Sequence, residues 1–316
     1  MLREKIDEAR RQTVVGEEQR VHKTKYVTKK TKKKRRRLII WGCVFVALCA
    51  LLISAFYAGL TVRHYELQSA KVQNGNSVRI VVIADLHSHL YGENQHVLLD
   101  KIKEQKPDII ALVGDIVDDE RNELSERQFL DGVADIAPAY YVIGNHEVWS
   151  GEWELIKDMV ASYGITVLTN DSETITINGI DLCIGGVEDP DVFPISHDEQ
   201  IRAMTSDKQM LEGFLSLSHD TYNVLLAHRP ERFEEYQKYG FDLVLSGHAH
   251  GGQVRIPGII NGLMAPNQGL FPKYAGGEYN ENSQTMVVSR GLSYNPRLPR
   301  IFNPPEVVVV DIVGKE

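Results

Sequence analysis

The longest apolar run of the chain covers residues 38–60 and lies directly after a basic stretch. It reads LIIWGCVFVALCALLISAFYAGL, which is 23 residues without a charged side chain. At about 1.5 Å per residue, a helix of this length crosses a hydrocarbon core of roughly 30 Å. Trp41 and Tyr57 stand near its two ends, where amphipathic rings prefer to lie. We therefore predict a retained single-pass anchor, with a cleaved signal peptide and a buried core helix as the alternatives.

The basic stretch over residues 23–37 sets the orientation expected for this anchor. It holds ten Lys and Arg residues, whereas the other flank offers only Arg63 and His64 before Lys71. Positive flanks stay in the cytoplasm, so the N-terminus is predicted on the cytoplasmic side of the cell membrane and residues 61–316 on its outer side. A basic stretch can also be a nuclear signal or a nucleic-acid-binding arm. Beside a membrane span, attraction to anionic lipid headgroups is the favoured interpretation.

Beyond residue 76 the apolar runs become short and alternate with amphipathic stretches. The first three predicted strands cover residues 78–85, 107–115 and 139–146. The predicted helices between and after them cover residues 96–105, a stretch after Asp119, and residues 152–164. Short apolar runs separated by helices are typical of buried parallel strands in an α/β sheet.

The pattern changes after residue 173. Residues 173–186 are predicted to form a hairpin, because Asn178-Gly179 joins two alternating runs. The remaining predicted elements are helices over 198–217 and 231–239 and strands over 222–228, 241–248, 284–291 and 306–312. Two sheets packed face to face, with helices outside, accommodate this order. The expected regions are a cytoplasmic tail, an anchor, a linker and a folded domain, at residues 1–37, 38–60, 61–75 and 76–316.

The two sides of the predicted anchor carry opposite charge. Residues 1–37 have a net charge of +10 and residues 61–316 one of −18, consistent with −8 for the whole chain. A domain this acidic does not attract polyanions through its bulk charge, so nucleic acid is disfavoured as a partner. A phosphate-containing ligand would need cations from solution. Cys183 is the only cysteine of residues 61–316, so no internal disulfide is possible there.

Side chains of metal-ligand type stand at the ends of five predicted strands. In chain order they are Asp85 and His87, Asp115, Asn145 and His146, His228, and His248 and His250. The carboxyl edge of an α/β sheet is where ligand sites form. Residues i and i+2 of an extended chain point the same way, so each closely spaced pair would face one site. Any of these residues alone also fits a turn, a helix cap or a core histidine; together they favour a functional site.

The segment LSGHAHGGQV at residues 245–254 has its own implication. Its two imidazoles would serve two adjacent metal positions. Gly247, Gly251 and Gly252 would let the backbone turn sharply and would leave room for ions and substrate.

These motifs resemble those of the calcineurin-like metallophosphoesterases. The resemblance covers residues 76–313 and rests on DLH at 85–87, GDIVD at 114–118, GNHE at 144–147, the histidine at 228 and GHAHGG at 247–252. The ending, with SRGLS at 289–293 followed by PRIFNPPEVVVVDI, is similar to a membrane-associated bacterial subgroup related to UDP-2,3-diacylglucosamine hydrolases. The resemblance implies a four-layer α/β/β/α sandwich of two mixed sheets flanked by helices, here preceded by one transmembrane helix.

The resemblance also implies a role for each matching residue. One metal would be held by Asp85, His87 and His250, and a second by Asn145, His228 and His248. Asp115 would bridge the two ions, and His146 would meet the phosphoryl oxygen or the leaving group. Mixed carboxylate, imidazole and amide ligands suit Mn, Fe or Zn better than Mg or Ca.

The expected chemistry is hydrolysis of a phosphoester. Two ions about 3.5–4 Å apart would clamp the phosphoryl group and generate a hydroxide that attacks phosphorus. We therefore predict a membrane-anchored dinuclear-metal phosphodiesterase acting on a lipid-linked, nucleotide or cell-envelope phosphoester. The alternatives are a general phosphomonoesterase and a non-catalytic, metal-containing envelope binding protein. No protein partner is implied.

Other residues have two interpretations each. His89, Asn94, Arg229 and Arg290 are candidate substrate contacts, or else solvated loop, turn and salt-bridge residues. Asp118 and Glu147 would orient ligating histidines, or else act as caps or face solvent. The apolar segments 256–266 and 267–277 would form a lid or an acyl contact, or else pack as loops.

Overall fold

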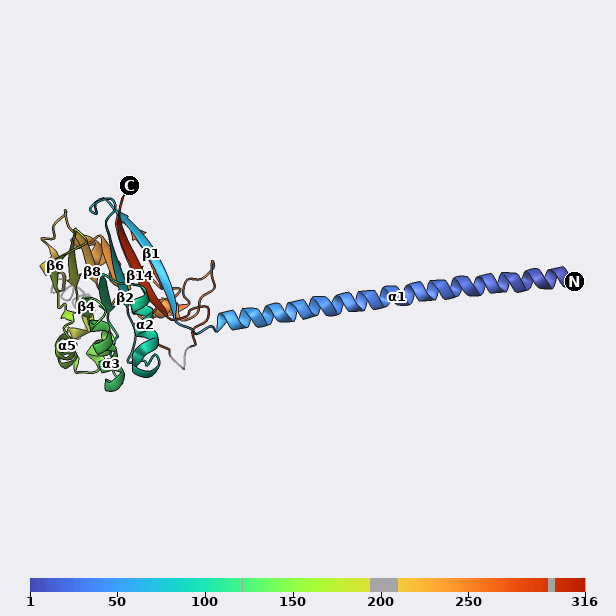
Figure 1. Cartoon of the computed structure of the whole chain (residues 1–316), viewed down its shortest axis with the longest axis horizontal. Coiled ribbons are helices and arrows are strands. Elements are labelled where there is room, and N and C mark those ends of the chain that lie inside the picture. Colours follow the sequence, from blue (N-terminus) through green and yellow to red (C-terminus); the bar gives the residue numbers. More distant parts are fainter. Residues whose placement is uncertain (121, 194–209, 295–298, 316) are drawn as a thin grey trace. The chain divides into compact units, whose positions relative to one another are not determined.

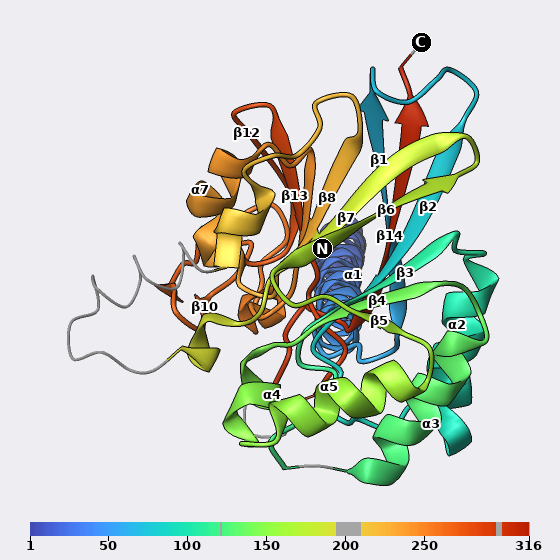
Figure 2. The same cartoon turned by 90° about the vertical axis from the view of Figure 1, so that its left-hand side faces the viewer.

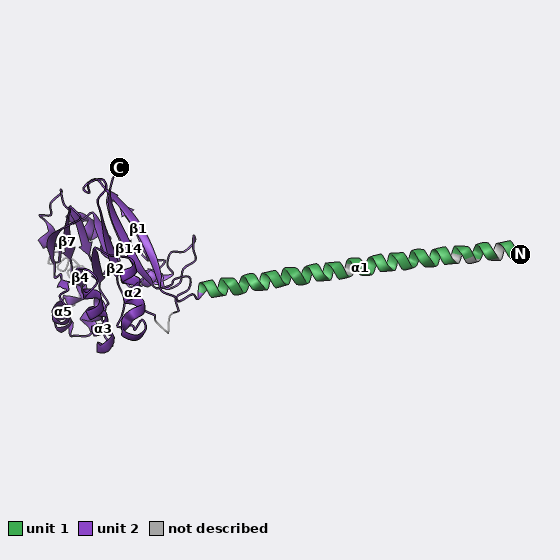
Figure 3. Ribbon diagram, in the orientation of Figure 1, with its two compact units in different colours: residues 1–55 green, residues 56–316 purple. Residues whose placement is uncertain are grey.

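The computed structural model describes all residues except 121, 194–209, 295–298 and 316 (Figure 1). The chain separates into two compact units, Met1–Ala55 and Phe56–Glu316 (Figure 3). The first unit is the single helix α1, Leu2–Ala55. The basic stretch and the apolar run thus share one helix, which ends before residue 60.

Helix α1 exposes its large apolar side chains. Trp41 and Ile53 are 71% and 72% exposed. Among the described helices, α1 is the one with a segment, within Ile6–Ala55, long and apolar enough to cross a membrane. An N-terminal helix of this kind occurs both in membrane anchors and in signal sequences.

The second unit is built on two six-stranded sheets (Figure 2). The first has the strand order β1-β14-β2-β3-β4-β5, formed by Thr61–Ser69, Glu306–Gly314, Ser77–Ile83, Ile109–Val113, Ala139–Val142 and Thr166–Val167. The second has the order β12-β13-β9-β8-β7-β6, formed by Gly277–Glu281, Gln284–Val288, Leu243–Ser246, Tyr222–Leu226, Ile180–Gly186 and Asp171–Ile177. Both sheets mix parallel and antiparallel pairs. A short third sheet pairs β10, Met264–Ala265, with β11, Gly269–Leu270.

The expected linker over residues 61–75 contains a strand of the first sheet. Strand β1 pairs in parallel with β14, with Thr61 opposite Glu306 and Ser69 opposite Gly314. Strand β14 in turn runs antiparallel to β2. The polar side chains of His64 and Glu66 suit this edge position, because an edge strand keeps one side and one face in water.

The described helices of the second unit lie on the outer faces of the sheets (Figure 2). They are α2, His96–Glu104; α3, Glu123–Ala134; α4, Asn145–Trp149; α5, Trp153–Ser162; and α7, Phe233–Tyr236. Short 3-10 turns cover Glu93–Gln95, Pro190–Val192, Glu212–Phe214, Pro230–Arg232, Gln237–Tyr239 and His250–Gly252. The helix predicted over 198–217 falls largely outside the described residues.

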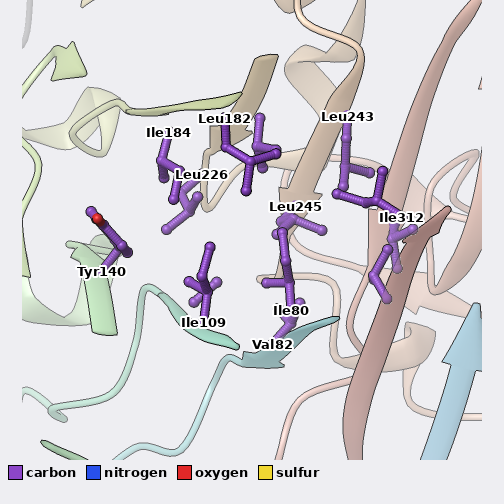
Figure 4. Packing of buried hydrophobic residues seen from close by; sticks show 14 of the residues in the cluster. Ile80, Val82, Ile109, Tyr140, Leu182, Ile184, Leu226, Leu243, Leu245 and Ile312 are labelled. Carbon is purple, nitrogen blue, oxygen red and sulfur yellow. The ribbon is translucent and has the colours of Figure 1, made fainter. Parts of the chain in front are cut away.

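Three apolar layers explain how these elements hold together. Between the sheets, Ile80 and Val82 of β2 share a cluster with Leu243 and Leu245 of β9 (Figure 4). The face of the first sheet that is turned away from the second sheet packs against α2, α3 and α5. The outer face of the second sheet packs against α7. Three interleaved apolar layers require four layers of secondary structure, so the expected α/β/β/α sandwich is confirmed.

Candidate metal centre

The candidate ligands meet where strands of both sheets end. Asp85 follows β2 and Asp115 follows β3, both in the first sheet. His228 follows β8 and His248 follows β9, both in the second. All four are at most 2% exposed. Asn145, 1% exposed, begins α4 just after β4, so five strand ends contribute to one buried cluster.

The closely spaced pairs converge by a different geometry from the one expected. Asp85 and His87 have φ values of 52° and 47°, and His248 and His250 have 65° and 47°. These residues are in the left-handed region, not in extended chain, so strand alternation does not aim them. Such backbone is costly for non-glycine residues and is concentrated at functional sites. Asp115, with φ 51°, shares the feature.

The ligand atoms fall into two groups that share one carboxylate. The first, which we call the open group, contains Asp85, His87, Asp115 and His250. The second, the buried group, contains Asp115, His228 and His248. Within each group the potential ligand atoms lie within 4.8 Å of one another. The two imidazoles of the GHAH segment therefore go to different groups, as the sequence predicts.

Three of the histidines have one ring nitrogen committed to a hydrogen bond. His228 Nδ1 is 2.9 Å from the carbonyl of Val113, and His248 Nε2 is 2.8 Å from Asn267 Oδ1. His87 Nδ1 is 3.2 Å from Asp118 Oδ1. In His228 and His87 this bond fixes the tautomer and leaves Nε2 as a lone-pair donor toward the cluster, whereas His248 Nε2 also lies 3.2 Å from Arg229 Nη1.

Five polar atoms of the cluster are buried and make no well-aligned hydrogen bond, although Asp115 Oδ2 and His228 Nε2 lie 3.1 Å apart. They are Asp85 Oδ2, His87 Nε2, Asp115 Oδ2, Asn145 Oδ1 and His228 Nε2. Unpaired polar atoms in a protein interior are costly, so this many within one cluster of ligand-type side chains fit a bound cation. The residues present therefore fit divalent metal ions.

The electric field of the cluster also favours a cation. Burial alone would lower the pKa of His228, but the carboxylates of Asp115 and Asp85 outweigh it and raise that pKa to about 10. A field that attracts a proton to this imidazole attracts a divalent ion more strongly.

Glycines allow the strand ends to approach this closely. A Cβ atom on Gly144 would lie 2.3 Å from Asp115 Oδ1, and one on Gly114 would lie 2.4 Å from His228 Nδ1. Gly114 also has φ +74°, which favours glycine. The glycines before Asp115 and Asn145 are thus explained by packing against candidate ligands.

Glu147 supports the site through the backbone. Its fully buried carboxylate accepts N–H groups of Asp115, Ile116 and Val117 at 2.8–2.9 Å, and that of Gly144 at 2.8 Å. These four bonds tie the loop after β3 to the start of α4. Glu147 therefore caps the loop, whereas Asp118 is the carboxylate that contacts a candidate ligand, His87.

Beside the open group lies a pocket of about 470 Å³. His146 lines it, with Nδ1 2.8 Å from both Asp118 Oδ1 and Asp119 Oδ1. Burial disfavours the imidazolium, but Asp118, Asp115 and Asp119 together raise the pKa of His146 to about 9. With Nδ1 bonded to carboxylates, Nε2 is the nitrogen available to a bound molecule.

The structure places the four expected substrate contacts differently. His89 lines the pocket. Asn94 is bonded to Gln128, and Arg290 forms a buried pair with Glu306, with Nη1 2.6 Å from Oε2. Arg229 is also buried and paired. Among the described residues, the structure brings only His89 of these four to the pocket wall.

Arg229 is instead part of a network that ends on a candidate ligand. Its Nε and Nη2 bond Asp189 at 2.5 and 2.8 Å, and Nη2 also bonds Asp191 at 2.9 Å. Its Nη1 donates to Asn267 Oδ1 at 2.8 Å, the oxygen that also faces His248. Asn267 therefore holds His248 in place, a role that no local pattern in the sequence indicated.

Several pocket residues were not predicted from the sequence either. They are Asp119, Glu120, Gln253, Ser293 and Tyr294. Ser293 closes the SRGLS segment, and its N–H donates to the carbonyl of Asp85 at 2.8 Å. That motif was the available signal for this side of the pocket.

Comparison with known proteins agrees with this geometry. A family model described as calcineurin-like phosphoesterase matches residues 78–252. An uncharacterized metallophosphoesterase of Aquifex aeolicus is 30% identical over 263 residues, covering 81% of this chain and 93% of the relative. The uncharacterized metallophosphoesterase YkuE of Bacillus subtilis is 27% identical over 254 residues, covering 78% of this chain and 82% of the relative.

A solved structure is also similar in outline. The phosphopantetheinyl hydrolase of Mycobacterium tuberculosis has a TM-score of 0.44 and 14% identity, covering 68% of this chain and 89% of that chain. The residues matched by the family model include all seven candidate ligands and also His146. The chain belongs to the calcineurin-like phosphoesterase family and is a metal-dependent phosphoester hydrolase.

Proposed function

We propose that the protein is a membrane-anchored phosphodiesterase with a dinuclear metal centre and an extracytoplasmic catalytic domain. The observation that carries the dinuclear part is the pair of ligand groups sharing Asp115, with their buried, unpartnered donor atoms. The open group would hold one ion and the buried group, completed by Asn145, the other. The mixed ligand set favours Mn, Fe or Zn.

The residues around these ions have separate tasks in the proposed reaction. When bound, two divalent ions supply the positive charge that holds a phosphoryl group and the acidity that ionises water near neutral pH. Asp115 keeps the two positions together. Asp118 orients His87 through Nδ1, and Asn267 orients His248 through Nε2.

His146 is proposed as the group that meets the substrate. Its Nδ1 proton is held by Asp118 and Asp119, so its Nε2 proton points to whatever occupies the pocket. A proton at Nε2 can stabilise charge on a phosphoryl oxygen or pass to the leaving oxygen.

The membrane location is proposed from α1. Its basic stretch and its exposed apolar side chains are what a single-pass anchor with a cytoplasmic N-terminus requires. The similarity of the C-terminal motifs to hydrolases of UDP-2,3-diacylglucosamine favours a lipid-linked or nucleotide-containing phosphodiester over a free phosphomonoester.

The proposal is tested with the full chain purified in detergent. We expect about two metal ions per chain, and faster metal-dependent hydrolysis of bis-p-nitrophenyl phosphate than of p-nitrophenyl phosphate. The variant His146→Ala should keep both ions and lose most of the activity. Metal retained without any turnover in the parent protein would instead identify a binding protein, and faster monoester hydrolysis would reassign the ester class.

A further inference from the structure

One ordered surface segment displays apolar side chains to solvent. We call residues 254–273 the rim segment. Four of its side chains are more than 40% exposed and large: Ile256 at 42%, Ile259 at 80%, Leu270 at 67% and Phe271 at 64%. Met264 adds a fifth at 43%. A contiguous group of exposed apolar side chains marks an interaction site.

The rim segment is held in this shape by its own polar contacts. Ile256 and Ile260 form an antiparallel bridge, and β10 pairs with β11. The Arg255 guanidinium bonds the carbonyl and the side chain of Asn261 at 2.9 and 3.0 Å. Arg255 and Asn261 therefore bond each other within the segment, while its large apolar side chains stay exposed.

The sheet topology fixes where the metal centre lies relative to the start of the domain. Strand β1 begins at Thr61, six residues after α1 ends, and six residues reach at most about 20 Å. Strand β14 is parallel to β1 and antiparallel to β2, and the three lie side by side (Figure 1). The carboxyl end of β2, which carries Asp85, is thus at the edge where β1 begins.

The pocket and the rim segment lie at that same edge. Tyr294, which lines the pocket, donates its hydroxyl to the carbonyl of Ala58. On the other side, Gln253 lines the pocket and directly precedes the rim segment. The rim segment joins residue 301 through the Val254–Ile301 bridge, and Pro305 nearby accepts the N–H of Thr61 at 2.9 Å.

The charge of the rim segment differs from that of the domain. Residues 61–316 hold 38 acidic and 20 basic side chains, yet residues 254–273 contain Arg255, Lys273 and no acid. Lys273 lies 3.3 Å from Glu281 outside the segment and keeps 57% of its side chain exposed. A cationic, apolar segment suits an anionic headgroup layer, whereas an average stretch of this domain would be repelled by it.

We propose that the rim segment docks on the bilayer that holds α1, so that the pocket opens at headgroup level. The substrate is then a phosphoester carried by a lipid of that membrane. This inference rests on the anchoring part of the proposed function and narrows its substrate class.

The test places a fluorescent reporter on the rim segment of the full chain in vesicles of phosphatidylcholine and phosphatidylglycerol. Cys43, Cys49 and Cys183 are first replaced by alanine. An environment-sensitive fluorophore is then attached to Ile259→Cys or, as the matched control, to Leu155→Cys on α5, a leucine that is 64% exposed. We expect a blue-shifted emission, quenched by a lipid-borne quencher, for position 259 only.

Equal, water-like emission at both positions would overturn the inference. Flotation of the vesicles reports the anchor separately, and hydrolysis of bis-p-nitrophenyl phosphate reports the enzyme. A protein that floats and hydrolyses this ester but leaves position 259 in water refutes the docking alone.

A second arm measures the consequence for substrate choice. The double variant Ile259→Glu, Phe271→Glu should hydrolyse a nitrophenyl phosphodiester linked to diacylglycerol in the vesicles about tenfold more slowly. Its rate on soluble bis-p-nitrophenyl phosphate should change less than about twofold, as should both rates of Leu155→Glu. An equal loss on both substrates, or no loss on either, would contradict the proposal.

Discussion

The two ligand groups that share Asp115 are built differently. In the buried group, the side chain of His228 has no exposed area and His248 is 2% exposed. In the open group, the side chains of His87 and His250 are 11% and 15% exposed and line the pocket. One half of the centre is thus enclosed between the sheets, and the other half forms a wall of the cavity.

The partners of the histidines follow the same division. Among the buried histidines, His228 donates to the carbonyl of Val113, and His248 Nε2 lies 2.8 Å from Asn267 Oδ1 and 3.2 Å from Arg229 Nη1. His87 of the open group instead donates to the carboxylate of Asp118, which also binds His146. The buried half is built for retention, whereas the open half is electrically linked to the group proposed to meet the substrate.

The largest effect is expected from removing the charge common to both halves. Asp115→Asn keeps the shape of the side chain and the oxygen that accepts the backbone N–H of His146 at 2.9 Å. It removes the negative charge that the two groups share. Metal analysis should find both positions depleted, and hydrolysis should fall about a thousandfold or more. A variant that loses only one ion, with an unchanged melting temperature, would show that Asp115 serves a single half.

A smaller effect, confined to the open half, is expected from Asp118→Asn. The Asp118 carboxylate accepts the Nδ1 protons of both His87 and His146. An uncharged amide has a single acceptor oxygen and stabilises protonated His146 less. Hydrolysis of bis-p-nitrophenyl phosphate should fall about a hundredfold, because general acid catalysis contributes an effect of that size. The ion of the buried half should remain, since no atom of Asp118 bonds its histidines among the described contacts. An unchanged rate of hydrolysis would mean that Asp118 does not support a catalytic role of His146.

Much of this arrangement could be predicted from the sequence because it depends on local pattern. The runs that became β2, β3, β8 and β9 are mostly apolar, and a ligand type stands two residues after the end of each. The order of these elements accommodates two packed sheets, and the resemblance to the calcineurin-like metallophosphoesterases implied the four-layer sandwich. Strand β1 was not predicted, since its polar residues at 64 and 66 resemble a linker when the partner β14 lies more than 200 residues away.

The finer geometry of the site depends on contacts that sequence pattern does not contain. Side chains alternate between the two faces only within a strand. The left-handed backbone at Asp85 and His248, which lie past the strand ends, was therefore not foreseen. The sequence left Arg229 open as a substrate contact or a salt-bridge residue, because its partner Asp189 is 40 positions away. Asn267 sits 19 positions after His248 in an apolar segment with no ligand motif.

The variant Asn267→Leu tests whether the metal site of the buried group can be weakened separately from that of the open group. This change removes the oxygen that bonds both His248 and Arg229, so the imidazole keeps only the Arg229 guanidinium beside Nε2. Affinity for one of the two ions should fall at least about tenfold, read directly by metal titration. Asn267→Asp keeps the acceptor oxygen and should restore the occupancy. If both variants bind two ions like the parent protein, Asn267 has no part in holding the site.

The smallest difference is expected in the order in which a chelator removes the ions from the unmodified protein. The open group is exposed to the pocket, so a chelator can reach its ion directly, whereas the buried group must first be uncovered by a local opening of the strand ends. Timed dialysis against EDTA should therefore give two phases, differing at least several-fold in rate, with activity lost in the first. The same experiment on Asn267→Leu provides the control, because loosening the buried half should bring the two phases together. Simultaneous loss of both ions from the parent protein would mean that the two halves open as one unit, and that the contrast in burial has no consequence for retention.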